Sequence, residues 1–161
     1  MSAVLRPVDV NDVDAVQALT TDPDWLRNIG SRGVTDKASA IHYIEHSVRP
    51  GYEVPGMGLF AVIDPESNAF MGLCGLLKRP DMPCPDLGFA LLPQFRGKGV
   101  ITQAGRHILA LSDNQHHTRI LAITLLENLG SQAVLGRLGF NFSHRTVREE
   151  ESVNVYEWVR A

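Results

Sequence analysis

The chain has 161 residues, 44% of them hydrophobic and 20% charged, and its formal net charge is -3. A chain of this length and composition is expected to form one globular domain, residues 1–161, that is stable without disulfides or a structural metal. Acidic and basic residues are interspersed, so the chain lacks the basic stripe that a nucleic-acid backbone requires, and we expect no nucleic-acid partner.

Hydrophobic patterning predicts alternating strands and helices. Ile101, Ala104 and Ile108 repeat at helical spacing, whereas 120–126 is a nearly continuous apolar run, typical of a strand buried on both faces. The predicted elements are, in order, a strand at 4–8, a helix from Asp9 or Asn11 to a break at 22–24, a helix from Thr35 or Asp36 to Pro50, strands at 59–63, 70–77 and 86–92, a helix after Gly99, a strand at 120–126, a helix at 128–138, and strands at 140–147 and 153–159. This order indicates a single mixed α/β structure.

The N-terminal segment and the cysteines predict the compartment. Met1–Arg6 has no apolar stretch typical of a signal peptide, and no apolar run of the chain is long enough to span a bilayer. We therefore expect a cytoplasmic protein without a membrane partner, in which Cys74 and Cys84 are reduced and Cys74 fills the core. His42 and His46 lack a third ligand at supporting spacing, so we expect two exposed histidines and no metal.

The segment Leu91–Thr102 joins a predicted strand to a predicted helix through a tight glycine loop. Gly97 and Gly99 can adopt unusual φ values, and the N–H groups and dipole of a helix start attract anions. Arg96 and Lys98 add positive charge beside the loop. The pattern indicates a pyrophosphate site, although a plain strand-to-helix turn fits the same spacing.

The spacing Gln94-x-x-Gly97-x-Gly99 resembles the Q/R-x-x-G-x-G/A signature of the GNAT acetyltransferase superfamily. Further segments are similar to the RimJ/RimL-like branch of that superfamily, namely 5–7, 29–34, 72–76, 86–93, 128–131 and 134–140. The resemblance spans nearly the whole chain. It implies the GNAT fold, an α/β structure with a mixed, mostly antiparallel central sheet of about seven strands flanked by about four helices.

The resemblance also implies a binding site for acetyl-CoA. The backbone of Leu91 and Leu92 would pair with the pantetheine arm, and Asn128 would bind the pantetheine at the start of the next helix. Asn128 by residue type alone predicts a helix N-cap, and the two roles are compatible. The pyrophosphate would be held in the loop that begins at Gln94, by the backbone amides of Arg96, Gly97, Lys98, Gly99 and Val100 and by the Thr102 hydroxyl.

Acetyl transfer to an amine requires a base, a donor to the oxyanion and a departing thiolate. Asp86 resembles the acidic base of the family, and an ordinary solvated loop aspartate fits the same position equally well. A backbone N–H near Phe89 or Ala90, freed by a strand bulge, would stabilise the oxyanion. Leu135 stands at the position of the tyrosine that protonates the thiolate in many relatives, and the RimL-like pattern suggests Ser131 as its replacement.

The predicted function is therefore acetyl-CoA-dependent N-acetylation of a primary amine by direct attack in a ternary complex. The acceptor is either a protein N-terminal α-amine or a small-molecule amine, since fold and cofactor loop do not determine it. We expect the acceptor site to be built from 23–34, 48–57 and 145–151. A non-catalytic acyl-CoA-binding sensor or assembly subunit is the alternative function, and the sequence leaves a monomer and a homodimer both open.

Overall fold

The computed structural model describes residues 3–161, which form one seven-stranded sheet and five α-helices. The elements are β1 (Val4–Arg6), α1 (Val13–Thr20), α2 (Pro23–Asn28), α3 (Lys37–Tyr43), β2 (Gly58–Ile63), β3 (Phe70–Leu77), β4 (Asp86–Leu91), α4 (Val100–Ala110), β5 (Arg119–Leu125), α5 (Leu129–Leu138), β6 (Asn141–Arg148) and β7 (Glu151–Val159). The strands lie in the order β1-β2-β3-β4-β5-β7-β6, and only β4 and β5 are parallel. The predicted α/β class with a mixed, mostly antiparallel sheet is confirmed.

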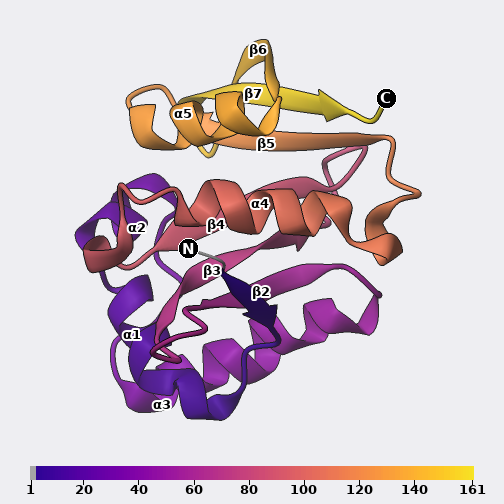
Figure 1. Cartoon of the computed structure of the whole chain (residues 1–161). Coiled ribbons are helices and arrows are strands. Elements are labelled where there is room, and N and C mark those ends of the chain that lie inside the picture. The colour runs from indigo at the N-terminus through magenta and orange to yellow at the C-terminus, as the bar shows by residue number, and fades with distance from the viewer. Residues whose placement is uncertain (1–2) are drawn as a thin grey trace.

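Helices cover both faces of the sheet, and each face has its own hydrophobic core (Figure 1). α4 and α5 cover one face, where the alternate β5 residues Ile120 and Ala122 pack with Leu135. α1, α2 and α3 cover the other face, where Leu19 and Ile44 are fully buried. Because strand side chains alternate between faces, neighbouring residues of β4 and β5 point into different cores.

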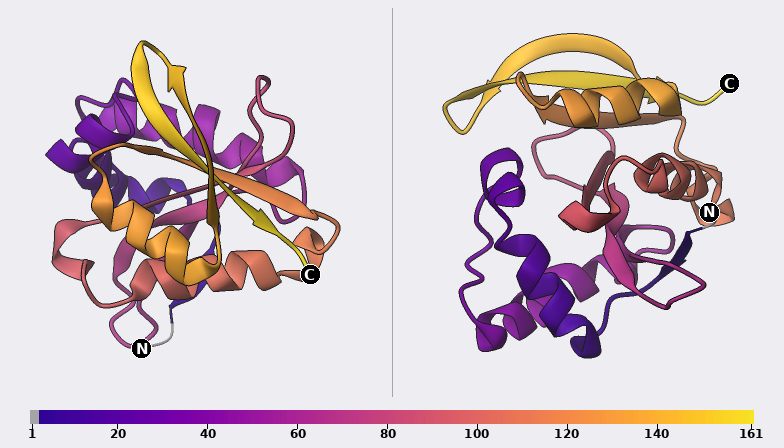
Figure 2. Two further views of the ribbon diagram at one scale, coloured as in Figure 1. Left: turned by 90° about the horizontal axis from the view of Figure 1, so that it is seen from above. Right: turned by 60° about the vertical axis from the view of Figure 1, so that its left-hand side comes forward.

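The sheet opens into a fork between its two parallel strands. β4 and β5 pair only at Asp86 and Leu121, where the Leu121 N–H donates to the Pro85 carbonyl at 2.9 Å. Beyond this point the strands diverge, and β5, α5, β6 and β7 form a C-terminal layer above the rest of the chain (Figure 2, right). The divergence leaves backbone groups of both strands without a strand partner at the centre of the molecule.

The helix α2 was not predicted from the sequence. Asp22 and Pro23, interpreted as the break of the preceding helix, also begin α2: the Asp22 carboxylate accepts the N–H of Asp24 at 3.1 Å, and Pro23 occupies the first turn. An aspartate before a proline is typical of a helix start, and this signal could have revealed α2. A second difference is that the helix expected to reach Pro50 is regular only to Tyr43 and continues as a π turn at Ile44–Val48.

The hairpin between β6 and β7 contains two strained residues. Glu149 and Glu150 form its two-residue loop with φ values of 48° and 66°, a region in which non-glycine residues cost about 1–2 kcal/mol each. Asn-Gly is the preferred sequence for such a turn. We expect the double substitution Glu149→Asn with Glu150→Gly to raise the free energy of unfolding by about 1–2 kcal/mol in urea titrations.

A control for the hairpin prediction is Glu66→Gly, in another exposed turn. Glu66 is not among the residues with positive φ. Glycine there would relieve no strain and would only increase the conformational entropy of the unfolded chain, so we expect a lower free energy of unfolding. A hairpin variant no more stable than the wild type would show that the turn is not strained.

Candidate active site

A cleft of about 1770 Å³ runs along the fork. Its walls come from β4, β5, the first turns of α4 and α5, α2, and the hairpin between β6 and β7. The predicted site residues that line it are Asp86, Leu91, Arg96, Gly97, Gly99, Val100, Thr102, Asn128 and Ser131. Leu92, Gln94 and Lys98 do not line it.

The glycine loop before α4 is open and has left-handed backbone at two positions. Gly97 and Gly99 have φ values of 77° and 74°, and a Cβ atom at either position would meet no heavy atom within 4 Å. Gly99 is the N-cap of α4, and no side chain in the described part of the chain caps this helix. Its first N–H groups therefore lack protein acceptors and lie at the positive end of the helix dipole. The loop fits an anionic group such as a pyrophosphate.

Thr102 lies in the first turn of α4 and is buried. Its hydroxyl oxygen is shielded from solvent and has no hydrogen-bond partner within residues 3–161. Since a buried hydroxyl without a partner destabilises a fold, Thr102 suits a ligand-binding role. Lys98 is exposed in the loop, and Gln94 is exposed in the preceding 3-10 turn.

Arg96, which was predicted to add positive charge beside the loop, is paired with acidic residues of α2. Its guanidinium pairs with Asp24 at 2.6 Å and Asp22 at 3.0 Å, and also donates to the Leu91 carbonyl at 2.9 Å. Two carboxylates thus neutralise Arg96, which ties α2 to the glycine loop. The remaining positive potential at the loop comes from Lys98 and the start of α4.

β4 presents an unpaired backbone edge to the cleft. A Cβ atom on Gly72 would lie 2.1 Å from the Ala90 carbonyl, so the backbone groups of Ala90 point toward β3. Strand backbone groups alternate in direction, and those of Phe89 and Leu91 therefore point toward the diverged β5. The expected bulge is absent, because β3 and β4 pair without a register shift. The Phe89 N–H faces the cleft because β5 has separated from β4.

The backbone of Leu92 is used within the sheet. Its N–H donates to the carbonyl of Met71 at 2.9 Å, and its side chain packs in the core on the side of α1 and α3. Leu91 keeps its N–H on the cleft side, while its carbonyl accepts from Arg96. A pantetheine arm alongside β4 would therefore find a donor at Leu91 and none at Leu92.

The start of α5 forms the opposite wall of the cleft. The Asn128 side chain accepts the Ser131 N–H at 3.2 Å, which confirms the predicted N-cap. The amide nitrogen of Asn128 is not used in this cap. Ser131 is half-buried in the first turn, and Leu135 is fully buried one turn further along the helix.

Asp86 lies where the fork begins and is only 2% exposed. It accepts the Arg79 Nε–H at 2.9 Å. Burial raises the pKa of the Asp86 carboxyl, and the Arg79 guanidinium opposes this shift. Asp86 is therefore not a solvated loop aspartate. A carboxyl that lines a cleft with a raised pKa is suited to accept a proton.

The faces of β4 separate Asp86 from the glycine loop. Leu87 and Leu91 pack in the core beneath α4, whereas Ala90 packs on the side of α1 and α3. By alternation the Asp86 side chain lies on the face opposite α4. A molecule bound at the glycine loop would reach Asp86 only through the fork.

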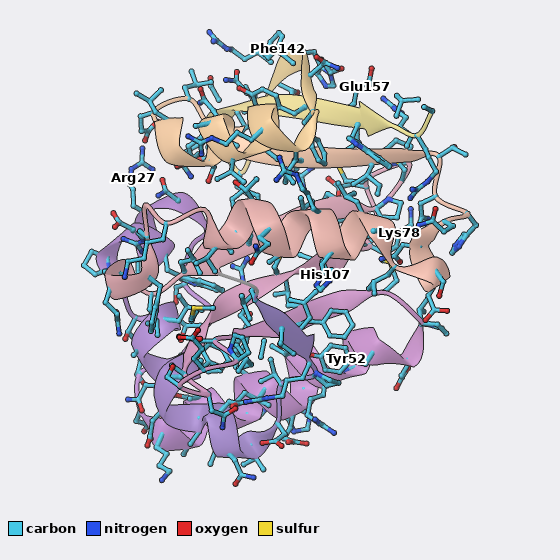
Figure 3. The ribbon with its side chains drawn as sticks, viewed as in Figure 1. Arg27, Tyr52, Lys78, His107, Phe142 and Glu157 are labelled. Atoms are coloured by element: carbon cyan, nitrogen blue, oxygen red, sulfur yellow. The ribbon has the colours of Figure 1, made fainter. Side chains whose placement is uncertain are left out.

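Arg27 bridges the mouth of the cleft, a feature that the sequence analysis missed. It extends from α2 toward the C-terminal layer (Figure 3) and forms ion pairs with Glu127 and Glu151. Trp25, two residues earlier on α2, is 4% exposed and donates its indole N–H to the Gly30 carbonyl at 3.1 Å. It belongs to the core and also lines the cleft. No sequence pattern links Arg27 to carboxylates more than ninety residues away.

The remaining cysteine and histidine residues lie outside the cleft wall. Both cysteines are free, and burial raises the pKa of the Cys74 thiol to about 12, as for a core residue. His42 and His46 are exposed and stack with ring centroids 4.3 Å apart. In the described chain, no three His, Cys, Asp or Glu side chains are grouped as a metal would require. None of its helices has the length and apolar character needed to cross a membrane.

Solved structures of acetyltransferases share this architecture. A GNAT-family acetyltransferase from Bordetella pertussis superposes with a TM-score of 0.77 at 20% identity, covering 97% of this chain and 94% of its own. The microcin C7 self-immunity acetyltransferase MccE, solved with acetyl-CoA and AMP, gives 0.81 at 16% identity, with 99% and 93% covered. RimL, the ribosomal L7/L12 α-N-protein acetyltransferase, solved with coenzyme A, gives 0.78 at 18% identity, with 99% and 94% covered.

The sequence itself matches a known family. None of the curated proteins compared with the chain matches it. The family model for the acetyltransferase (GNAT) domain, however, matches residues 3–141. This match extends from β1 to the start of β6 and contains the glycine loop, the fork and the start of α5. The chain therefore belongs to the acetyltransferase (GNAT) family, with RimL-type enzymes among its structural relatives.

Proposed function

We propose that the protein transfers an acetyl group from acetyl-CoA to a primary amine by direct attack in a ternary complex. Membership of the family identifies the protein as an acyltransferase with acetyl-CoA as co-substrate. The observation that carries the mechanism is the fork. The open glycine loop lies on one face of the sheet and the buried Asp86 on the other, and this arrangement supports a co-substrate and an acceptor that meet in the fork.

The residues around the loop and β4 would hold the co-substrate. The first N–H groups of α4 and the Thr102 hydroxyl donate to the pyrophosphate, and Lys98 adds charge at the entrance. The Leu91 N–H and the amide of Asn128 donate to the pantetheine. Bound acetyl-CoA supplies an activated thioester, which the fork would place beside the N–H of Phe89.

The chemical step requires an uncharged amine beside the thioester carbon. Asp86 accepts a proton from the acceptor amine, directly or through a water, and Arg79 holds its carboxylate in place. The Phe89 N–H donates to the oxygen on which negative charge develops. Direct attack needs both molecules bound at once. The acceptor and the co-substrate would enter the fork from opposite faces of the sheet, so that neither blocks the other.

A protein N-terminal α-amine is the acceptor that we propose. An α-amine has a pKa of about 8 and is far less protonated at neutral pH than a lysine amine, whose pKa is about 10.4. With an α-amine, a larger fraction of the acceptor is already uncharged, so the reaction depends less on proton removal by Asp86. RimL, a structural relative, is an α-N-protein acetyltransferase. Product analysis by mass spectrometry with peptides, free amino acids and polyamines tests this acceptor, and preferential acetylation of a lysine or polyamine amine would contradict it.

Replacement of Gly97 by glutamate is expected to abolish the thermal stabilisation by acetyl-CoA. Binding at about 100 times the dissociation constant stabilises the wild type by about 2.7 kcal/mol, which a melting curve detects. The variant places a negative charge and a side chain where the pyrophosphate would lie, so its Tm should not respond. Acetyl-CoA, adenosine diphosphate and pantetheine are the ligands to compare.

Gly33→Glu is the matched control for the cofactor loop. Gly33 has a φ of 73°, close to that of Gly97, and also has no heavy atom within 4 Å of a Cβ position. It does not line the cleft. The control should therefore carry the same strain and retain the response to acetyl-CoA. If acetyl-CoA shifted the Tm of Gly97→Glu and of Gly33→Glu equally, the phosphate site would have to lie elsewhere.

The alternative function is a sensor or assembly subunit that binds acyl-CoA without turnover. The absence of a tyrosine at Leu135 favours this alternative, because no hydroxyl at that position reaches the leaving sulfur. Stabilisation by acetyl-CoA without acetylation of any amine in the panel would support the sensor and contradict the enzyme mechanism.

A further inference from the structure

Thr124 on β5 has a buried hydroxyl that the fold leaves without a partner. The residue is 4% exposed, and its Oγ1 atom has no hydrogen-bond partner within the described chain. Thr124 nevertheless lines the cleft. Buried polar atoms are nearly always satisfied, so an orphaned hydroxyl at a cleft wall suggests a partner that enters the cleft.

The cross-strand neighbour of Thr124 cannot supply that partner. Asn154 lies directly opposite on β7, and its side chain is therefore on the same face. Its Oδ1 atom accepts from Arg145 at 3.2 Å, and its amide nitrogen donates to the Tyr156 hydroxyl at 3.4 Å. Both polar atoms of Asn154 bond to other side chains, and neither bonds to the Thr124 hydroxyl.

Thr124 lies opposite Phe89 across the fork. The two strands last touch at Asp86 and Leu121, and Phe89 and Thr124 each follow three residues later. At about 3.3 Å per residue, both lie about 10 Å from the base of the fork. The thioester group that accepts a hydrogen bond from Phe89 would therefore lie level with Thr124.

The direction of the Thr124 side chain places it opposite Asp86. It alternates in step with Ile120 and Ala122, which pack against α4 and α5. Asp86 faces the other side of the sheet, where the amine is expected to approach. In an acyl transfer the nucleophile and the leaving group occupy different positions around the carbonyl carbon. Asp86 on one face of the sheet could therefore serve the amine, while Thr124 on the other face serves the leaving sulfur.

We propose that Thr124 donates a hydrogen bond to the sulfur of coenzyme A as it leaves. The amine nitrogen forms a bond to the carbonyl carbon, the carbon–sulfur bond breaks, and its electron pair stays on sulfur. The amine proton goes to Asp86, and the thiolate is stabilised by the Thr124 hydroxyl until solvent protonates it. The inference rests on the proposed acetyl transfer, and it assigns to β5 the role that Leu135 on α5 cannot fulfil.

The experiment measures the pKa of the coenzyme A thiol when bound, from the ultraviolet absorbance of its thiolate. A hydrogen bond to the thiolate lowers this pKa. In Thr124→Val, which keeps the shape and removes the hydroxyl, the thiol pKa should rise, and both kcat and the affinity for coenzyme A at alkaline pH should fall about tenfold or more. Thr124→Ser should retain the wild-type values.

Two controls separate this role from a structural one. Desulfo-coenzyme A lacks the sulfur and should bind wild type and Thr124→Val equally. The valine variant should melt at the same temperature as the wild type or higher, because it removes an unsatisfied polar atom. Thr124→Ala serves as a second variant if valine does not fit.

The outcomes distinguish this inference from the proposed function. If Thr124→Val has the same thiol pKa and kcat as the wild type, the role of Thr124 is overturned and the proposed function stands. The same holds if the thiol pKa rises in Ser131→Ala and does not rise in Thr124→Val. Failure of the wild type to bind coenzyme A at all overturns the proposed function and this inference together.

Discussion

Asp86→Asn is expected to lower kcat by about 10²–10⁴-fold, the usual contribution of a general base, while the affinity for acetyl-CoA stays at the wild-type value. Asparagine retains the size of the side chain and the contact with Arg79, but it cannot accept a proton from the amine. The glycine loop lies on the other face of the sheet and is not affected. Steady-state kinetics combined with the acetyl-CoA thermal shift separates the two effects.

The pH dependence gives this prediction a sign. Burial raises the pKa of Asp86, so kcat/KM should fall as the pH drops through a pKa above that of an ordinary aspartate. This acidic limb should be missing in Asp86→Asn. Stability follows the opposite sign: the contribution of Asp86 to the free energy of unfolding is greatest at low pH and is lost as the pH rises through its folded pKa.

Asp81→Asn is the matched control for Asp86. Asp81 pairs with Arg148 at 2.6 Å, as Asp86 pairs with Arg79, but it is exposed and does not line the main cleft. It should therefore retain nearly wild-type kcat. Equal losses in both variants, or full activity in Asp86→Asn, would show that another group accepts the proton.

Gly75→Ala is expected to destabilise the fold by about 4 kcal/mol or more, at the upper end of single substitutions. A Cβ atom on Gly75 would lie 1.8 Å from the carbonyl oxygen of Gly58, and these two glycines lie on the paired strands β3 and β2. Neither strand can yield without breaking its ladder. Urea denaturation, with the midpoint and slope analysed together, measures the loss.

Gly88→Ala on β4 is the control for strand glycines in the same sheet. Its Cβ atom would meet only the ends of two leucine side chains, Leu77 at 3.4 Å and Leu59 at 3.7 Å. We expect a change of less than about 1 kcal/mol at Gly88, because flexible side chains can adjust. Similar stabilities of the two variants would mean that β2 and β3 can separate more easily than their pairing suggests.

The sequence predicted most of the fold because its signals are local. The helix after Gly99 and the apolar run of β5 follow from repeating patterns a few residues long. α2 was missed since its six residues are too few to show a helical period, and ion pairs of Asp22 and Asp24 with Arg96 help to hold it in place. The hairpin β6–β7 was placed within a few residues of its actual bounds.

Some features of the candidate site could be predicted from local sequence signals, and others could not. The glycine loop could be recognised because Gly97 and Gly99 are close in sequence and their spacing is itself the signal. The sequence could not reveal the neutralisation of Arg96, the burial of Asp86 or the ion pairs of Arg27, because each depends on residues brought together from distant segments. The free N–H of Phe89 was expected for the wrong reason, since only the separation of β5 explains it.

The sequence by itself determined the α/β class, the family and the position of the glycine loop, since periodicity and glycine spacing act over short distances. Only the tertiary structure decided which charges remain free, which edge of β4 is open and which face each side chain points to. The physical reason is that β4 and β5 pair at a single position. The pairing at Asp86 and Leu121 joins segments more than thirty residues apart, and the divergence beyond it exposes Phe89 and leaves Thr124 without a partner.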